Sequence, residues 1–323
     1  MTIKDLKRYP EMSEPQLRPR YSGVATFFRR PLVDTADGVD IGVIGVPFDG
    51  GVTNRTGTRH GPRAVREQTT LVRRVNQATG ISPFDIVNVA DCGDAFFEAP
   101  YELISAHKEI EAFFAKVKKS GATTLAVGGD HSISLPILRA IAKDGPVGMV
   151  HIDAHCDTGD DYLGSKFHHG APFSRAVEEG LLDPKRVIQI GIRGSINHKD
   201  MWKFSHDSGM RVVYMEELTD KGWAWAAEEA RRIVGDGKTY LSFDIDSLDP
   251  VFAPGTGTPE SGGITMIEAQ RMIRSLDGIN FIGGDLVEVS PPFDNGTITS
   301  MNGANVLFEI LCVLAAARQK RNG

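Results

Sequence analysis

Strand-like and helix-like stretches alternate along most of this chain, and this alternation limits its fold more than any other feature. The run Ile41–Val46 has no polar side chain and is typical of a strand buried on both faces. Strands that alternate with helices predict a mostly parallel sheet covered on both sides, a three-layer α-β-α architecture of the α/β class. The other predicted strands are residues 86–89, 123–127, 147–152, 187–192, 211–214, 239–243 and 280–287, and the predicted helices are residues 101–119, 134–142, 223–234, 266–276 and 304–318, with another helix opening at Pro62.

One predicted strand ends in alternating acidic and histidine residues. Directly after the apolar run 147–150, Asp153, His155 and Asp157 occupy every second position. Alternate side chains of an extended backbone point the same way, so these three are expected to converge. Carboxylates gathered on one face repel each other and lose hydration unless a cation holds them together. This stretch therefore predicts a metal site.

Two further strand ends carry residues of the same kind. The run 240–243 leads into Asp244 and Asp246, and the run 125–127 is followed by His131. In a parallel sheet, ligands bind beyond the carboxyl ends of the strands, so these groups are expected to meet. Four carboxylates and two imidazoles would match the charge of two divalent cations. The predicted ligands are His131, Asp153, His155, Asp157, Asp244 and Asp246.

The donor types indicate which metal to expect. A single zinc ion would need fewer acidic ligands. Carboxylate oxygens with some imidazole favour manganese over metals that prefer soft ligands, and they also suit nickel and cobalt. We therefore expect two Mn²⁺ ions, with Ni²⁺ or Co²⁺ as alternatives.

Composition and charge exclude several classes of protein. The chain has 323 residues, a formal net charge of -6 and no run rich in lysine and arginine, so no nucleic acid partner is expected. There is no apolar signal region near Met1 and no apolar run that we expect to span a membrane. The glycine-rich loop 47–61 lacks the ending of a phosphate-binding loop. Three scattered cysteines indicate a reducing compartment, and we expect the cytosol.

No change in composition divides the chain, so we expect a single domain over residues 1–323. Residues 1–38 form a polar, proline-containing arm with aromatic and basic residues around Tyr21 and Phe27–Arg29. Such an arm usually packs on the body of the protein or on a neighbouring subunit. Its aromatic character favours a homo-oligomer.

Several motifs of this chain resemble, in order, those of the ureohydrolase family of arginases and agmatinases. They are Gly-Gly-Asp-His-Ser at 128–132, Asp-Ala-His-Cys-Asp at 153–157, His-Gly at 169–170, Ser-Phe-Asp-Ile-Asp-Ser-Leu-Asp-Pro at 242–250, Pro-Gly-Thr-Gly-Thr-Pro at 254–259 and Glu-Val-Ser-Pro at 288–291. The resemblance extends from about Arg20 to the last helix. It implies the arginase/deacetylase-like form of the three-layer fold, and it suggests a trimer or hexamer.

The resemblance also assigns roles to the predicted ligands. It implies that Asp153 and Asp244 bridge both metal ions. It implies that His131 and Asp157 complete the coordination of one ion. It implies that His155 and Asp246 complete the coordination of the other.

The chemistry that the resemblance implies is hydrolysis of a guanidino group to urea and an amine. Two neighbouring metals lower the pKa of a bridging water, so that hydroxide is available to attack the guanidinium carbon. Glu288 matches the family's guanidinium-pairing glutamate, and a bidentate carboxylate suits that planar group. His169 matches the family histidine to which proton transfer is attributed.

Other polar residues near these motifs are expected to support the ligands or to pack. Asp130 and Asp285 are expected to orient His131 or loop amides. Cys156 should face away from the metals and pack as a small apolar side chain. The remaining histidines are assigned no role: His151 inside a predicted strand, His168 in a loop, and His60, His107, His198 and His206 elsewhere.

The far end of the substrate decides which guanidino compound is cleaved. Arginases have an acidic loop where this chain has residues 191–197, which contain no carboxylate, so free arginine is disfavoured. Residues 21–29 and 158–166 are most similar to the branch that takes guanidino acids, so we expect 3-guanidinopropionate or 4-guanidinobutyrate. Tyr162 is predicted to shorten the pocket and to favour the propionate. The candidate donors to the substrate carboxylate are Asn54, Arg55, Arg59 and Lys166.

Three alternatives remain open at this point. Within the hydrolases, agmatine is the next candidate substrate, followed by small alkylated guanidines. A metal-dependent deacetylase shares the architecture, but it is expected to hold one zinc ion with a different donor set. A noncatalytic subunit of a mixed oligomer would hold fewer than two metals per chain.

Overall fold

The computed structural model describes residues 19–322, and every structural statement below concerns these residues. An 8-stranded sheet in the order β2-β1-β3-β8-β7-β4-β5-β6 forms its centre, and all neighbouring strands are parallel. The strands are β1 (Ile41–Val46), β2 (Val89–Asp94), β3 (Thr123–Gly128), β4 (Val147–Ile152), β5 (Leu182–Ile192), β6 (Arg211–Tyr214), β7 (Thr239–Asp244) and β8 (Phe281–Val287). The predicted parallel sheet is thus confirmed.

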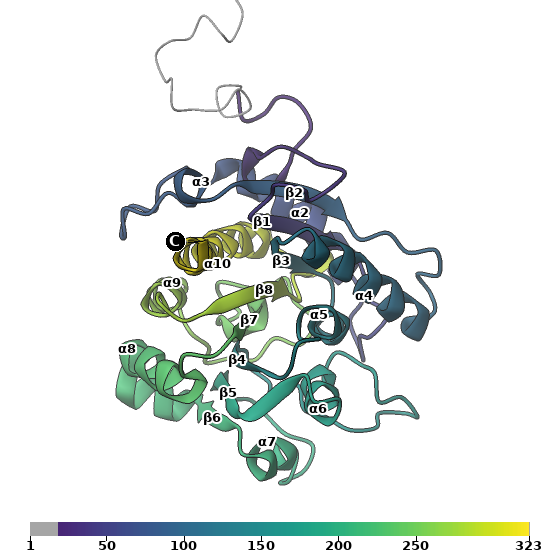
Figure 1. Ribbon diagram of the computed structural model, residues 1–323. Coiled ribbons are helices and arrows are strands. Elements are labelled where there is room, and N and C mark those ends of the chain that lie inside the picture. Colours follow the sequence, from purple (N-terminus) through teal and green to yellow (C-terminus); the bar gives the residue numbers. More distant parts are fainter. Residues whose placement is uncertain (1–18, 323) are drawn as a thin grey trace, which may run out of the picture.

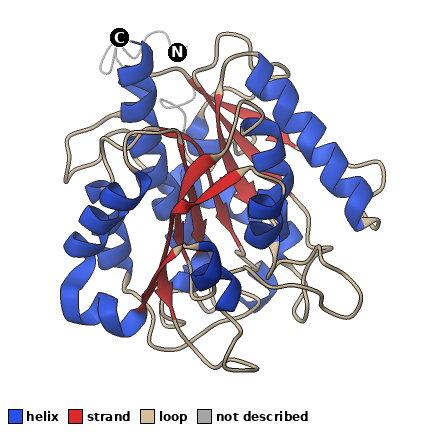
Figure 2. Ribbon diagram, turned by 60° about the horizontal axis from the view of Figure 1, so that its bottom comes forward, coloured by secondary structure: helices blue, strands red, loops and turns tan. Residues whose placement is uncertain are grey.

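Helices cover both faces of the sheet and complete the predicted three layers. The α-helices are α2 (Gly61–Gln68), α3 (Pro83–Ile86), α4 (Leu103–Lys119), α5 (Ser134–Ile141), α6 (Pro172–Glu178), α7 (Lys203–Ser208), α8 (Met215–Val234), α9 (Met266–Ser275) and α10 (Ile298–Asn322). Figure 1 shows α4, α5 and α6 on one side of the sheet and α8, α9 and α10 on the other. In Figure 2 the strands lie between these two layers of helices.

The sheet is central because its middle strands are apolar on both faces. Every residue of β1, β3, β4 and β7 is buried. One apolar core lies between the sheet and α8, α9 and α10, and a second lies between the sheet and α4, α5 and α6. Parallel strands that read as continuous apolar runs need this cover on both sides.

The order of the strands places four of them side by side at the middle of the sheet. β3 pairs with β8, β8 with β7, and β7 with β4, although these strands are far apart in the chain. Parallel strands end at the same edge, so the segments that follow β3, β4, β7 and β8 meet there. Asp244 is the last residue of β7, and the other predicted ligands and Glu288 lie in these segments.

The predicted strand at 86–89 is wrong. Residues Pro83–Ile86 form the short helix α3, and β2 begins only at Val89. Proline favours the first turn of a helix, which explains the early helix. β2 itself contains the buried Asp91, which accepts hydrogen bonds from the backbone of Phe27 and from Arg66. A strand with a buried acid lacks the apolar run from which strands were predicted.

Several other boundaries differ from the prediction. The predicted helix at 223–234 is the second part of α8, which is interrupted at Gly222, where φ is 82°. The helices α6 and α7 were not predicted. α10 is longer than the predicted helix at 304–318. It is also long and apolar enough to cross a membrane, although no membrane-spanning run was expected from the sequence. Of its most apolar window, 83% is buried, because α10 packs against β8, α9 and α2.

The second half of the predicted arm packs on the body of the protein, and residues 1–18 lie outside the described residues. Phe27–Arg29 form a short 3-10 helix, η2, with Phe27 and Phe28 buried. The backbone nitrogens of these two phenylalanines donate to Asp91 and to Thr69. These contacts attach the arm to β2 and to the segment after α2.

Candidate metal centre

His131 follows β3 and points its Nδ1 at three carboxylates. This nitrogen lies 3.2 Å from Oδ2 of Asp153, 2.9 Å from Oδ2 of Asp157 and 3.2 Å from Oδ2 of Asp244. All four side chains are buried, and their ligating atoms lie within 4.8 Å of one another. This group, called the first ligand group, combines residues from the ends of β3, β4 and β7.

The hydrogen bonds around His131 indicate which of its two ring nitrogens carries the hydrogen. Ser242 Oγ donates to Oδ1 of Asp285 at 2.7 Å, so its oxygen accepts from Nε2 of His131 at 2.8 Å. Nδ1 of the neutral ring then presents a lone pair to the first ligand group. A lone pair directed at carboxylates is repulsive unless a cation lies between them, so the donor set suits a metal ion.

His155 and Asp246 form a second ligand group with Asp153. Nδ1 of His155 lies 3.2 Å from Oδ2 of Asp246 and 3.5 Å from Oδ1 of Asp153. Asp153 thus directs Oδ2 toward the first group and Oδ1 toward the second. Of the residues predicted to bridge, Asp153 belongs to both groups, whereas Asp244 belongs to the first. Oδ1 of Asp244 accepts the backbone N–H of Asp246 instead.

The electrostatics of the two groups favour bound cations. Burial, together with the charges of Asp246 and Asp153, raises the pKa of Asp244 well above its ordinary value. Burial opposes a charge on His131, but hydrogen bonds to Asp153, Asp157 and Asp244 raise its pKa well above normal. The same negative field that would hold a proton at Nδ1 attracts a divalent ion.

The ligands converge through turns rather than through an extended strand. β4 ends at Ile152, Asp157 has a φ of 49°, and Oδ1 of Asp153 accepts the backbone N–H of His155 at 2.7 Å. Asp246 likewise lies in the 3-10 helix η6 (Ile245–Ser247), which Asp244 caps. The predicted convergence is therefore present, but side-chain hydrogen bonds to the backbone produce it.

Glu288 lies beside the first ligand group with one oxygen free. Its Oε1 accepts the backbone N–H of His131 and Nδ1–H of His169, both at 2.9 Å. Its Oε2 is buried and has no hydrogen-bond partner among residues 19–322. Glu288 also has a φ of 63°, a strained value for this residue that places the carboxylate at the end of β8. A buried carboxylate oxygen without a partner is suited to receive a cationic substrate group.

His169 connects Glu288 to the loop after β1. Its Nε2 lies 2.9 Å from Oγ1 of Thr53, which was not predicted as a site residue. Burial lowers the pKa of His169, but the charge and hydrogen bond of Glu288 outweigh this effect and raise the pKa to about 9. In this structure Nε2 of His169 also accepts the backbone N–H of Thr53 at 3.3 Å, and the raised pKa favours uptake of a further proton there, which would allow His169 to act as an acid.

The predicted substrate-binding residues Asn54, Tyr162 and Lys166 lie in exposed loop segments. Tyr162 is exposed, forms a turn with Ser165, and its ring lies 5.8 Å from that of His168. Nζ of Lys166 lies 3.3 Å from Oδ1 of Asp160, so this cation already has a carboxylate partner. Asn54 is exposed and directly follows Thr53.

The two other candidate carboxylate donors differ in their surroundings. Arg59 is bound to Asp49, whose Oδ1 lies 2.5 Å from Nε of Arg59. The guanidinium of Arg55 lies 5.0 Å from the ring centre of Phe293. Arg59 therefore has a structural partner, and Arg55 does not pair with a carboxylate in the described chain.

The supporting residues behave as expected. Asp130 accepts the backbone N–H groups of Gly51 and Ser132. Asp285 accepts hydroxyl hydrogen bonds from Ser134, Tyr240 and Ser242, and through Ser242 it orients His131. Cys156 is fully buried and packs with Ile192, Trp202 and Val212.

Arg193 is a buried residue of the site that was not predicted from the sequence. Its guanidinium donates to five carbonyl oxygens, those of Gly191, Asp246, Ser247, Leu248 and Glu260. These hydrogen bonds join the segment after β5 to the loop that carries Asp246. Only a single arginine after an apolar strand marks this role in the sequence, and that signal is not specific.

A family model described as the arginase family matches residues 39–313. The chain belongs to this family. The family's binuclear divalent metal site corresponds to the two ligand groups that share Asp153.

Known proteins are similar over nearly the whole length of the chain. It is 50% identical to a guanidinopropionase of Pseudomonas aeruginosa over 95% of this chain and 96% of that protein. It is 48% identical to a mitochondrial agmatinase of Gallus gallus over 96% of this chain and 90% of that protein. It is also 48% identical to a guanidinobutyrase of Pseudomonas aeruginosa over 92% of this chain and 94% of that protein. The structure of proclavaminate amidinohydrolase from Streptomyces clavuligerus has a TM-score of 0.89 at 38% identity and covers 93% of this chain and 100% of that one.

Proposed function

We propose that the protein hydrolyses the guanidino group of a small guanidino acid, 3-guanidinopropionate or 4-guanidinobutyrate, to urea and an amino acid. The observation that carries this proposal is the free, buried Oε2 of Glu288 beside two ligand groups that share Asp153. The similarity to a guanidinopropionase and a guanidinobutyrase supports the substrate class.

The residues of the site can each take a defined part in this reaction. Two divalent ions, when bound by the ligand groups, would supply an activated water at neutral pH. Oε2 of Glu288 would accept N–H groups of the planar guanidinium and orient its carbon. Nδ1–H of His169 is committed to Glu288, so Nε2, beside Thr53, would pass a proton to the departing amine.

Manganese is the metal that we propose for both ligand groups. Their donors are carboxylate oxygens and two imidazole nitrogens, and the cysteine nearest to them, Cys156, packs away from the groups. Such donors suit Mn²⁺, and they also suit Ni²⁺ and Co²⁺. Metal analysis of the purified protein, followed by reconstitution with each ion separately, tests this choice.

Agmatine is the second candidate substrate, because an agmatinase is 48% identical to this chain, the same identity as the guanidinobutyrase. The two substrate classes differ in the charge of the far end, a carboxylate in one and an ammonium in the other. Urea release should be measured on guanidinopropionate, guanidinobutyrate, agmatine, arginine and dimethylguanidine with the same manganese-loaded protein. A higher kcat/KM for agmatine than for both acids would contradict the proposed substrate class.

We also propose that the protein is a homo-oligomer, a trimer or hexamer. Three large apolar side chains in the described part of the arm are exposed in the single chain, namely Tyr21, Val24 and Leu32. Burial of such residues against another copy is favourable. Light scattering of the purified protein measures the mass directly, and a monomer would contradict this proposal. The cytosolic location remains a prediction.

A further inference from the structure

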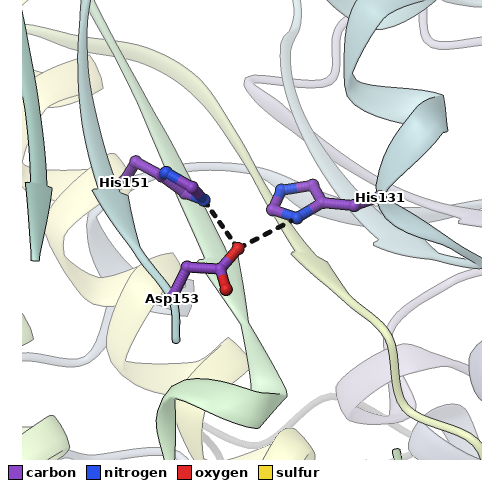
Figure 3. Close-up of side chains that lie close together, drawn as sticks. All are labelled: His131, His151 and Asp153. Atoms are coloured by element: carbon purple, nitrogen blue, oxygen red, sulfur yellow. Dashed lines mark hydrogen bonds and ion pairs between the residues drawn. The ribbon is translucent and has the colours of Figure 1, made fainter. Parts of the chain in front are cut away.

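His151 is a fully buried histidine of β4 to which the proposed reaction assigns no part. Its Nε2 lies 2.8 Å from Oδ2 of Asp153, and its Nδ1 lies 3.2 Å from Nε2 of Gln189 on the neighbouring strand β5. Figure 3 shows that the imidazoles of His151 and His131 approach the same oxygen of Asp153 from different sides. Asp153 is the carboxylate that belongs to both ligand groups, so His151 contacts the residue that joins them.

Gln189 determines which nitrogen of His151 carries the hydrogen. Nε2 of Gln189 lies 2.5 Å from the carbonyl oxygen of Cys156, which can only accept a hydrogen bond, so the amide nitrogen is the donor there. The second hydrogen of the same nitrogen is directed at Nδ1 of His151, which therefore accepts. The ring therefore carries a hydrogen on Nε2 and donates it to Asp153.

His151 lies outside the two groups that are rich in carboxylates. His131, His151 and Asp153 lie close enough together to hold an ion, but they offer only one carboxylate. The first ligand group offers three, and a divalent ion that prefers oxygen ligands favours it. The ring of Phe173 also packs against the imidazole of His151 at a centroid distance of 4.5 Å. These contacts are those of a residue that supports a ligand.

We propose that His151 is a positioning residue that holds the shared carboxylate of Asp153 in one orientation, with Gln189 fixing the tautomer that makes this possible. Rotation of an aspartate carboxylate about its last torsion is soft, so the side chain alone does not fix where its two oxygens point. Here Oδ2 accepts Nε2–H of His151, and Oδ1 accepts the backbone N–H of His155. Removal of the first donor frees the carboxylate to turn and loosens both metal sites.

Three variants test this inference, which rests on the two-metal centre of the proposed function but not on its substrate. His151→Phe removes the donor and keeps the ring volume, whereas His151→Gln keeps an amide N–H where Nε2–H was. His107→Phe is the matched control, because His107 is also a buried histidine with aromatic neighbours, and it lies outside the ligand groups. Each protein is loaded with Mn²⁺ and dialysed against increasing concentrations of a chelator.

The first measurement is the number of Mn²⁺ ions retained per chain. We expect His151→Phe to bind Mn²⁺ more weakly, so that the free Mn²⁺ concentration at which it has lost half of its metal is about 10- to 100-fold higher than the corresponding concentration for the unaltered protein. This is the usual effect of removing a group that orients a ligand. We expect His151→Gln and His107→Phe to retain Mn²⁺ like the unaltered protein. The Tm of each protein is measured in parallel with and without Mn²⁺. The difference between the two values reports metal binding alone, because any destabilisation of the metal-free fold affects both values.

Two results would overturn the inference. Unchanged Mn²⁺ retention in His151→Phe would show that the donor is not needed. Equal losses in His151→Phe and His151→Gln, or in the His107 control, would show that the imidazole itself or general packing matters instead. If the unaltered protein holds two Mn²⁺ ions but releases no urea from any guanidine, the proposed function fails and the retention data still decide this inference.

Discussion

Glu288 and His169 are joined by a 2.9 Å hydrogen bond from Nδ1 to Oε1, and this contact leaves Oε2 of Glu288 without a partner in the described part of the chain. One oxygen of the carboxylate thus holds the histidine, while the other remains available to a substrate. The pair comes from the end of β8 and from the loop before α6, and the backbone N–H of His131 holds it against the first ligand group. Catalysis and metal binding are therefore physically connected at this point.

The substitution Glu288→Gln is expected to lower kcat/KM by about 100-fold or more, because it removes the charge that orients the guanidinium. Manganese content should stay the same, since Glu288 contacts only the backbone of a ligand. Steady-state urea release and metal analysis measure the two effects. Glu178→Gln, which changes a surface glutamate paired with Arg175, is the matched control. A Glu288 variant with normal turnover would exclude Glu288 from substrate binding.

The rate is expected to depend on the protonation of His169. Its pKa is raised to about 9 in the metal-free site, against the effect of burial, by Glu288 and partly by the charge of Asp157. Bound Mn²⁺ neutralises the charge of Asp157 and lowers the pKa, so kcat should fall as the pH rises toward 9. His169→Gln should lower kcat by about 100-fold or more and should remove this alkaline decline. Profiles of kcat between pH 7 and 10.5, with saturating Mn²⁺, compare the two proteins. The same alkaline decline in both would assign it to another group.

The length of the substrate is expected to depend on Tyr162. This side chain lies in the exposed turn with Ser165, and replacement by a thinner methionine should admit a longer chain. In Tyr162→Met, the ratio of kcat/KM for guanidinobutyrate to that for guanidinopropionate should rise by about 10-fold, as expected for one methylene. Leu163→Met, at the neighbouring exposed position, should leave the ratio unchanged. Equal turnover of both acids by the unaltered protein and by Tyr162→Met would contradict this role.

Acid should destabilise the protein partly through His107. Burial, with a smaller effect from the charge of Arg139, lowers the pKa of His107 from 6.5 to about 4. Between these values the unfolded chain binds a proton that the folded protein does not, so stability falls as the pH decreases from 6.5 to 4, by at most about 3 kcal/mol. Above pH 6.5 this contribution is absent.

Urea unfolding of metal-free protein at pH 7 and at pH 4.5 measures this effect. His107→Phe should lose less stability between the two pH values than the unaltered protein does. The difference between the two losses isolates His107 from the other titrating groups, which both proteins share. Identical losses would show that His107 does not titrate in this range.

Arg193 should contribute more to stability than a typical surface arginine. Arg193→Lys is expected to lower the free energy of unfolding by about 2–4 kcal/mol, because it leaves several buried carbonyl groups without a donor. Arg186→Lys is the control, since Arg186 also donates to carbonyl groups, those of Val234 and Lys238, but at a less buried position. Equal changes in the two variants would contradict a special role for the buried guanidinium.

Much of the fold and of the site could be predicted because the signals are local. The apolar runs of β1, β3, β4 and β7 identified these strands, whereas β2 was misplaced because its buried Asp91 hides the apolar pattern. The ligands could be named because aspartate and histidine in alternation are costly without a cation. His151 and Arg193 were missed because a buried histidine or arginine has the same local sequence whether or not it supports a site.

The sequence by itself determined the identity of the candidate ligands and their location at strand ends, since side-chain type and a period of two residues are properties of short segments. Only the tertiary structure decided that β3, β8, β7 and β4 are neighbours, that Asp153 turns one oxygen to each ligand group, and that Gln189 and His151 stand behind it. These relationships depend on pairing between residues far apart in the chain, and such pairing is set by how the whole sheet packs rather than by any one segment.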